Sequence, residues 1–203
     1  MKNPELIPFE NHFQLSRADL KNILNIALSR GGDFSEIFLE YRTYNLINME
    51  EEIIKETAES ISLGLGIRVI AGEKTGYGYA NDLSTEKIKK AALVAASIAS
   101  GKAQRNASFL SQAQLQHNLY PVLEPTHRES LERKISLVKE AYYAAKNFDQ
   151  KIEKVKVSFQ DQVQFITVVN SEGLSVSDAR PLVKLVCMAI AEKDGKREAG
   201  FSG

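Results

Sequence analysis

The chain has 203 residues, of which 43% are hydrophobic and 26% are charged, proportions that are ordinary for a folded globular protein. Lysine plus arginine and aspartate plus glutamate both number 26, so the formal net charge is zero. A neutral chain lacks the broad basic field on which non-specific nucleic-acid binding depends, which argues against direct DNA or RNA contact. The single cysteine, Cys187, rules out an intrachain disulfide and fits a reducing compartment.

The N-terminus and the apolar runs indicate a protein that is neither secreted nor membrane-bound. Residues 1–15 contain no apolar signal-peptide core and include Pro4 and Pro8. The longest apolar stretch, residues 91–99, is too short to span a bilayer. These features predict a cytoplasmic protein.

An extended arm is predicted for residues 1–15, followed by a helix that starts at Ser16. Ser16 and Asp19 resemble a capping box, and Gly31-Gly32 ends the helix. The predicted apolar stripe of this helix comprises Leu20, Ile23, Leu24, Ala27 and Leu28.

Two strands are predicted next. Alternation of apolar and polar residues from Glu36 to Tyr44 predicts the first strand, with Ile37, Leu39 and Tyr41 on one face. A tight turn then leads into a second predicted strand over residues 45–56. The acidic residues 50–52 are poor strand formers and suit a solvated surface.

The segment from Leu63 to Ala80 predicts a β-hairpin with a two-residue turn at Gly72-Glu73. This turn sets the register, so that Arg68 faces Tyr77 and Gly66 faces Tyr79. An aromatic ring is expected to cover a strand glycine on that face. Gly76 and Gly78 share the other face with Leu65, Ile67 and Val69, which leaves room for a helix to lie close.

The rest of the chain is predicted to hold two helices and four strands. One helix starts at Ser84 and stops at Gly101, and a polar loop covers residues 102–125. The apolar side of this helix is predicted to comprise Ile88, Ala91, Ala92, Ala95, Ile98 and Ala99. Thr126 and Glu129 predict a capping box for the second helix, whose buried residues are Leu131, Ile135, Val138, Ala141, Tyr142 and Ala145. The strands are predicted over residues 152–160, 163–170, 174–178 and 182–192. The last of these is apolar on both faces from Val183 to Ile190, which predicts a covered central strand.

These elements predict an α+β fold in which a largely antiparallel sheet packs with about three helices. We expect one domain over residues 1–203, with possible sub-repeats at 16–100 and 126–203 joined by the loop 102–125. The repeat is suggested by the turn at Lys193–Lys196, which corresponds to the turn of the earlier hairpin.

No residue pattern typical of a metal site is present. His12, His117 and His127 each lack a second histidine at metal-binding spacing. His127-Arg128-Glu129 matches half of a deaminase signature, but no P-C-x-x-C motif follows. We therefore assign no metal ligand within these 203 residues.

Nucleotide-binding and nucleophile motifs are also missing. Residues 64–69 begin like a dinucleotide fingerprint, but they lack the third glycine and continue as a strand. Cys187 lies in an apolar strand, where a thiol is buried and unreactive. We assign no catalytic and no cofactor-binding residue, and the residues alone indicate a scaffold or a binding domain.

Two segments resemble the TldD/PmbA family, long called modulators of DNA gyrase. They read GLGIRVIAGEKTGYGYAND from Gly64 to Asp82 and NSEGLSVSDARPLVKLVCMAIAEKDGKREAGFSG from Asn170 to Gly203. The resemblance extends along essentially the whole chain, as the N-terminal domain of such a protein. The run from Ala179 to Val183 resembles the TldD-type subunit more than its PmbA/TldE-type partner.

This resemblance implies a subunit of a cytoplasmic zinc metallopeptidase that pairs with a TldE/PmbA-like subunit. Its substrates are expected to be unfolded or partly processed peptides. The family's H-E-x-x-x-H motif and later cysteine ligand belong to a C-terminal domain, expected beyond Gly203. This chain is thus expected to be an inactive part that shapes the chamber and the heterodimer.

Two other functions remain open. One is a stand-alone peptide-binding or regulatory module that captures extended peptides by strand addition at a sheet edge. The other is an action on DNA gyrase, which the neutral charge disfavours where it requires direct DNA binding.

Overall fold

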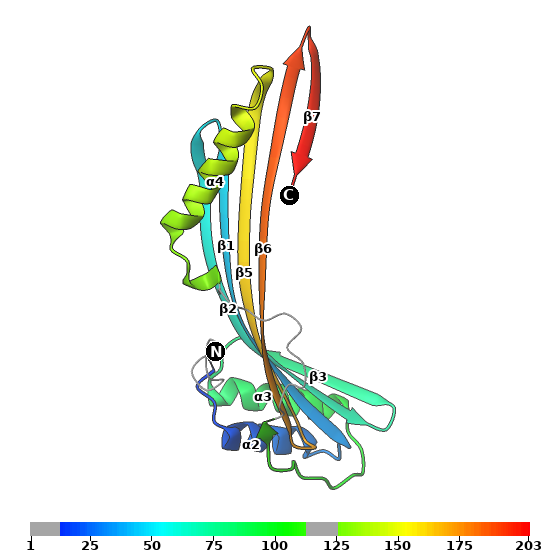
Figure 1. Ribbon diagram of the computed structural model, residues 1–203. Helices are drawn as coiled ribbons and strands as arrows, with labels where there is room; N and C mark the ends of the chain where they lie inside the picture. Colours follow the sequence, from blue (N-terminus) through cyan, green and yellow to red (C-terminus); the bar gives the residue numbers. More distant parts are fainter. Residues whose placement is uncertain (1–12, 113–125) are drawn as a thin grey trace. The chain divides into compact units, whose positions relative to one another are not determined.

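The computed structural model describes residues 13–112 and 126–203, and its strands form a single sheet in the order β3-β2-β1-β5-β6-β4, with β7 also paired to β6 (Figure 1). The two hairpin pairings, β2–β3 and β6–β7, are antiparallel, whereas the short β4 runs parallel to β6. The strands are β1 (Phe34–Glu50), β2 (Ile53–Ala71), β3 (Lys74–Ala80), β4 (Ser111–Gln112), β5 (Ile152–Asn170), β6 (Leu174–Lys193) and β7 (Lys196–Ser202).

The helices of this α+β fold are α2 (Arg17–Leu28), α3 (Thr85–Ile98) and α4 (Leu131–Lys146), with a short 3-10 helix at Thr126–Arg128. The predicted fold class is therefore confirmed. None of the helices among the described residues is long and apolar enough to cross a membrane. Residues 1–12 of the predicted arm and residues 113–125 of the predicted loop lie outside the described residues.

The chain forms two compact units that alternate along the sequence. Unit 1 comprises residues 1–42, 62–123 and 164–179, and unit 2 comprises residues 43–61, 124–163 and 180–203. The strands β1, β2, β5 and β6 each contribute to both units, and each unit has its own hydrophobic core. The predicted sub-repeats at 16–100 and 126–203 stay a prediction.

Helix α2 of unit 1 starts as the sequence predicts. The Ser16 hydroxyl accepts a hydrogen bond from the Asp19 amide at 3.2 Å, and the Asp19 carboxylate accepts one from the Ser16 amide at 2.9 Å. The Ser16 hydroxyl also donates to the Asp19 carboxylate at 2.6 Å, and this bond, followed by the one from the Ser16 backbone amide, holds the pKa of Asp19 below its ordinary value. The whole predicted stripe, Leu20, Ile23, Leu24, Ala27 and Leu28, is buried.

The β2–β3 hairpin of unit 1 has the predicted register. Arg68 pairs with Tyr77 and Gly66 with Tyr79, and Gly72 turns the chain at a φ of +57°. The ring of Tyr77 covers Gly66, where any β-carbon would collide with it, as expected for an aromatic ring over a strand glycine. Arg68 forms an ion pair with Glu36 of β1 at 2.9 Å.

Helix α3 packs directly on this hairpin, as the glycines predict. A β-carbon at Gly76 or Gly78 would overlap the carbonyl oxygen of Ala95 or Ala91. The placement of Ile98 on the same side as the packed alanines is wrong, because its side chain is 55% exposed, whereas Ala96 is buried.

The predicted turn before Asn45 is wrong. Strand β1 continues to Glu50, and the turn lies at Glu51 and Glu52, whose φ angles are +52° and +63°. Asn45 keeps the extended conformation because its side chain donates a hydrogen bond to Asp161 of β5 at 2.7 Å. A tertiary partner therefore satisfies the amide that would otherwise favour a turn.

The predicted capping box at Thr126 and Glu129 is also wrong. Helix α4 of unit 2 starts one turn later, with Ser130 as N-cap accepting from the Arg133 amide at 3.2 Å. Leu131, predicted to be buried, is 48% exposed. The fully buried side chains of α4 are instead Lys134, Val138 and Tyr142, which lie one turn apart on the same helix face.

The later strands are longer and less covered than predicted. β5 runs through Asp161 without a break, and β6 runs through Pro181. Val183 to Ile190 is not a covered strand, because Val183 is 48% and Met188 39% exposed. Neighbouring strands cover the edges of a central strand, but its faces are buried only where another layer of the fold packs on them.

Candidate functional site

The described residues offer no donor set for a metal ion. Among residues 13–112 and 126–203, no three His, Cys, Asp or Glu side chains lie together closely enough to hold one. His12, His117 and the side chain of His127 lie outside what the structure describes. The zinc site therefore remains an expectation that comes from the family resemblance.

Cys187 and the glycine-rich segment 64–69 have structural roles. Cys187 is half-buried in β6, and desolvation raises the pKa of its thiol, which disfavours the reactive thiolate. Residues 64–69 lie wholly within strand β2, so no helix N-terminus follows them to bind a phosphate.

A groove in unit 1 runs between the outer edge of β3 and helix α3. Its volume is about 540 Å³, and it is lined by Tyr77, Gly78, Tyr79, Ala80, Asn81, Asp82, Lys87, Lys90, Ala91 and Val94. The Asp82 carboxylate accepts the Ser84 amide at 2.8 Å, which lowers the pKa of Asp82 and orders the turn into α3. The two lysines are exposed on the helix wall.

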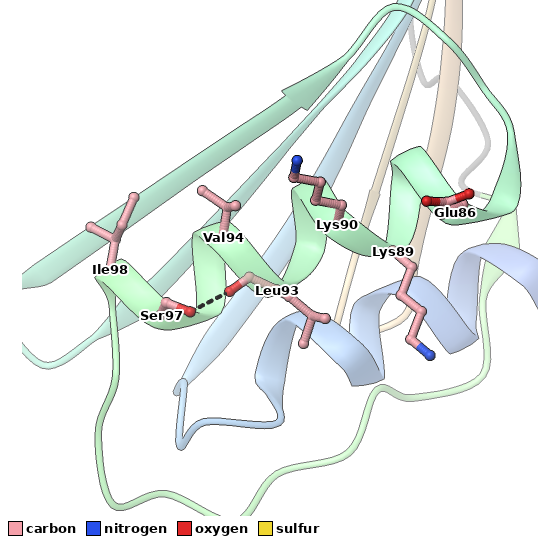
Figure 2. A pocket seen from close by; sticks show the side chains of 7 residues that line it. All are labelled: Glu86, Lys89, Lys90, Leu93, Val94, Ser97 and Ile98. Carbon is pink, nitrogen blue, oxygen red and sulfur yellow. Dashed lines mark hydrogen bonds between the residues drawn. The ribbon is translucent and has the colours of Figure 1, made fainter.

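The outer face of α3 continues from this groove as a shallow apolar surface. Figure 2 shows its lining, in which Lys90 and Val94 point to one side of the helix and Lys89 to the other. Leu93, Val94 and Ile98 are 36%, 43% and 55% exposed. The Ser97 hydroxyl does not face a ligand, because it donates to the Leu93 carbonyl at 2.6 Å.

A buried polar cluster lies under the start of α4 in unit 2. The Lys134 ammonium lies 2.7 Å from Asp161 Oδ2, and Asp161 Oδ1 accepts a hydrogen bond from the side-chain amide of Asn45 at 2.7 Å. Both charged side chains are at most 7% exposed. Asn45 and Lys134 also line a hollow of about 280 Å³ together with Glu59 and Glu129. Because each ionic group already has its counter-charge, we assign the cluster a structural role.

The sequence reasoning missed both arrangements. The groove had a usable signal, since Lys87, Lys90 and Val94 recur at helical spacing on the face next to the buried alanines. The buried cluster of Lys134, Asp161 and Asn45 had no such signal in the sequence, because no neighbouring residue distinguishes the buried Lys134 from the exposed Lys139 on the same helix.

A further feature of unit 2 is the exposed apolar surface of β6 and β7. Met188 and Phe201 are cross-strand partners, and they are 39% and 84% exposed. Leu182 of β6 is 60% exposed. No side chain from residue 180 to 203 is fully buried.

Comparison with known proteins identifies relatives over most of the chain. Residues 35–99 match the family model described as PmbA/TldA metallopeptidase domain 1. Residues 124–203 match the model described as PmbA/TldA metallopeptidase central domain.

Two curated relatives are named metalloprotease TldD homologs. The one from Haemophilus influenzae is 29% identical over 191 residues, covering 93% of this chain and 39% of the relative. The one from Buchnera aphidicola is 28% identical over 193 residues, covering 95% of this chain and 40% of the relative. The chain thus spans about two fifths of the length of these relatives.

Solved structures share the fold at low sequence identity. A proposed modulator of a DNA gyrase from Thermotoga maritima has a TM-score of 0.73 at 19% identity, with 92% of this chain and 42% of that chain covered. TldE from Thermococcus kodakarensis has a TM-score of 0.71 at 16% identity, with 90% and 42% covered. With both family models matched in order along the sequence, the chain belongs to the PmbA/TldD metallopeptidase family.

Proposed function

We propose that this chain supplies the non-catalytic N-terminal part of a TldD-like zinc metallopeptidase that cleaves unfolded or partly processed peptides. The observation that carries the proposal is the match of residues 35–99 and 124–203 to the first and central domains of a metallopeptidase family. The relatives named as metalloproteases are much longer than this chain, which leaves room for a separate catalytic part.

The chemistry is assigned to that separate part. A bound zinc ion supplies a polarised water for attack on a peptide carbonyl. The described residues provide no set of ligands for it, so no step of hydrolysis is attributed to them. Their role is to shape the chamber and to support assembly with a TldE/PmbA-like subunit in the cytoplasm.

The surface of β6 and β7 supports the assembly role. Met188 and Phe201 lie side by side across the two strands with a large part of each side chain in water. Apolar side chains grouped in this way on a soluble protein commonly mark a protein contact. The similarity in fold to a protein named TldE supports a proposed partner of the same architecture.

The proposal is tested by zinc content and hydrolysis. We expect the 203-residue chain to contain no stoichiometric zinc by mass spectrometry and to leave an unfolded casein substrate intact. The full-length gene product, mixed with its TldE/PmbA-like subunit, is expected to hold zinc and to hydrolyse casein until a chelator is added. One zinc per 203-residue chain, or chelator-sensitive hydrolysis by that chain alone, would contradict the assignment.

The alternative function, a stand-alone peptide-binding module, has one observation in its favour. The groove beside β3 has an edge strand on one side and a helix on the other, a setting in which an extended peptide can add to a sheet. A full-length protein without zinc or hydrolytic activity would favour this alternative.

A further inference from the structure

We propose that the groove between β3 and α3 binds an extended acidic peptide segment, which adds to β3 as a further strand. The inference rests on the groove itself and not on the metallopeptidase proposal. Every residue that carries it belongs to unit 1.

The edge of β3 presents free backbone groups at alternate residues. A two-residue turn makes Ala71 and Lys74 a hydrogen-bonded pair, and such pairs recur at every second residue of an antiparallel ladder. The amides and carbonyls of Thr75, Tyr77 and Tyr79 therefore point away from β2. Among the described residues, β3 has β2 as its sole strand partner, so these groups have no protein strand to bind.

The usual protections of an edge strand are lacking here. Sheet edges are commonly blocked by proline, by a charged residue in mid-strand, by a bulge or by a covering segment. The segment from Thr75 to Ala80 contains no proline and no charge, and its pairing with β2 is regular throughout. An uninterrupted, uncharged edge is a suitable template for an added strand.

Helix α3 forms the wall of the groove because the glycines of β3 let it approach closely. Gly76 and Gly78 lie in direct backbone contact with Ala95 and Ala91. The helix therefore flanks the strand edge and directs its exposed side chains toward the groove, among them Val94 (Figure 2).

The positive charges on helix α3 favour a ligand with negative charges. Lys87 and Lys90 line the groove, and the carboxylate that lines it, Asp82, is already held by the Ser84 amide. A peptide with acidic side chains facing α3 complements the two lysines, whereas a basic peptide is repelled.

The opposite face of the added strand meets aromatic side chains. Tyr79 is 79% and Tyr77 55% exposed on the face away from α3. Side chains alternate across a strand, so a bound segment directs every second residue toward α3 and the others toward the tyrosines. The fitting pattern alternates acidic residues with β-branched apolar residues, which pack well beside an aromatic cross-strand neighbour.

The probe that tests the proposal is a fluorescein-labelled octapeptide of alternating valine and glutamate, titrated into the 203-residue chain by fluorescence anisotropy. We expect saturable binding that weakens as salt is raised. The same peptide with lysine in place of glutamate is expected to bind at least about tenfold more weakly. Equal affinity for both peptides, or no binding at about 1 mM protein, would overturn the proposal.

The backbone contact is tested by proline at an outward-facing position. Tyr79→Pro removes one outward amide without breaking the ladder to β2, and we expect it to weaken binding about tenfold. The matched control, Tyr79→Ala, keeps the amide and is expected to weaken binding by less than about threefold. Circular dichroism establishes whether both variants fold. If two folded variants lose the same amount of peptide affinity, strand addition is contradicted.

The charge contact has its own matched pair on α3. Lys90→Glu places a negative charge in the groove, and we expect about a fivefold loss of affinity at low salt. Lys89→Glu makes the same charge change on the other side of the helix and is expected to alter affinity by less than about twofold. Figure 2 shows the two lysines pointing to opposite sides. Equal losses in the two variants would contradict a contact with α3.

Amide hydrogen exchange reads the site directly. In the free chain the amides of Thr75, Tyr77 and Tyr79 are expected to exchange quickly, and saturation with the peptide is expected to slow them. If these amides are already protected from exchange in the free monomeric chain, another part of the chain covers the edge of β3, and the proposal is overturned. Protection that grows with protein concentration alone would assign the edge to a second copy of the chain instead.

Discussion

At the scale of single residues, the polar group formed by Lys134, Asp161 and Asn45 decides the local structure of three elements. Its two charges lie 2.7 Å apart with both side chains buried. Such a pair is weak evidence for net stabilisation, since desolvation offsets much of the attraction, but removing one member leaves a bare buried charge.

We predict that Lys134→Met lowers the free energy of unfolding by about 3 kcal/mol, because it leaves the buried Asp161 carboxyl group without its partner. The double variant Lys134→Met/Asp161→Leu is expected to recover most of this loss, since it removes both charges. Urea denaturation followed by circular dichroism measures each value.

The control for this change is Lys139→Met on the exposed side of α4, expected to alter stability by less than about 0.5 kcal/mol. A loss of similar size in the single and double variants would mean that packing, and not the unpaired carboxylate, determines the effect.

At the scale of elements, the β1–β2 turn has a strained backbone that other residues at the same two positions would relieve. Glu51 and Glu52 both have positive φ, a region in which residues with a β-carbon are unfavourable and asparagine and glycine are favoured. We predict that Glu51→Asn/Glu52→Gly raises the free energy of unfolding by about 1 kcal/mol. Thermal unfolding is expected to shift upward by about 3 °C.

The matched control is Glu51→Gln/Glu52→Gln, which removes the same two charges but leaves both residues strained. Glu51 pairs with Lys55 at 3.6 Å on the exposed surface, so losing that pair is expected to change little. If the control gains as much stability as the designed turn, charge repulsion and not backbone strain is the cause.

The two hairpins offer a paired test of helix packing on a sheet. Gly78 and Gly200 each lie four residues after the first residue that follows their turn. A β-carbon at Gly78 would overlap Ala91 of α3, whereas nothing lies within 4 Å of one at Gly200. We predict that Gly78→Ala costs about 2 kcal/mol or more.

Gly200→Ala is the control, expected to be neutral or slightly stabilising because alanine restricts the unfolded chain. Chemical denaturation of both variants, with peptide binding to the β3 groove as a second readout, measures the effect. Equal stability of the two variants would mean that α3 moves away from β3 without penalty.

The elements that the sequence predicts correctly are those fixed by local chemistry. The Ser16 cap, the stripe of α2 and the β2–β3 register follow from neighbouring residues and a tight turn. The breaks predicted near Asn45 and after residue 160 are absent because polar residues there pair with each other and with Lys134. Only the tertiary fold brings these partners together, so no local pattern reveals them.

Pro181 shows the same limit on β6. Separate strands are predicted over residues 174–178 and 182–192, and proline lacks the amide that a ladder requires. The strand continues because β4 and β7 pair only with residues 174–175 and 187–193 along β6. Among the described residues, neither β4 nor β7 pairs with β6 at Pro181, so an amide there is dispensable. For the β3–α3 groove the sequence analysis predicted the hairpin and the room for a helix, but it did not use the helical spacing of Lys87, Lys90 and Val94 that marks the helix wall.

At the scale of the whole molecule, the balance of charges decides whether the chain is expected to bind DNA directly. Acidic and basic residues are equal in number, and no run of lysine and arginine, Lys89-Lys90 included, is longer than two residues. On α3 these lysines are accompanied by Glu86, which reduces the local positive field. Direct DNA binding is therefore the alternative that this balance of charges disfavours.

We predict that the chain does not bind a 20-base-pair duplex at concentrations up to about 100 μM, the weak end of ordinary non-specific affinity. The physical reason is that binding gains free energy from counterions released as basic residues neutralise phosphates, and a chain with 26 acidic and 26 basic residues repels the duplex about as much as it attracts it. Fluorescence anisotropy of the labelled duplex at 50 and 200 mM salt measures this, with the acidic octapeptide as a positive control for an active preparation. An affinity that falls about a thousandfold between the two salt concentrations would reveal several phosphate contacts. Such a result would contradict the prediction and direct attention to the lysines of α3. Lys89→Glu and Lys90→Glu would then lower the affinity for the duplex by similar factors, although they are expected to differ in their effect on peptide binding.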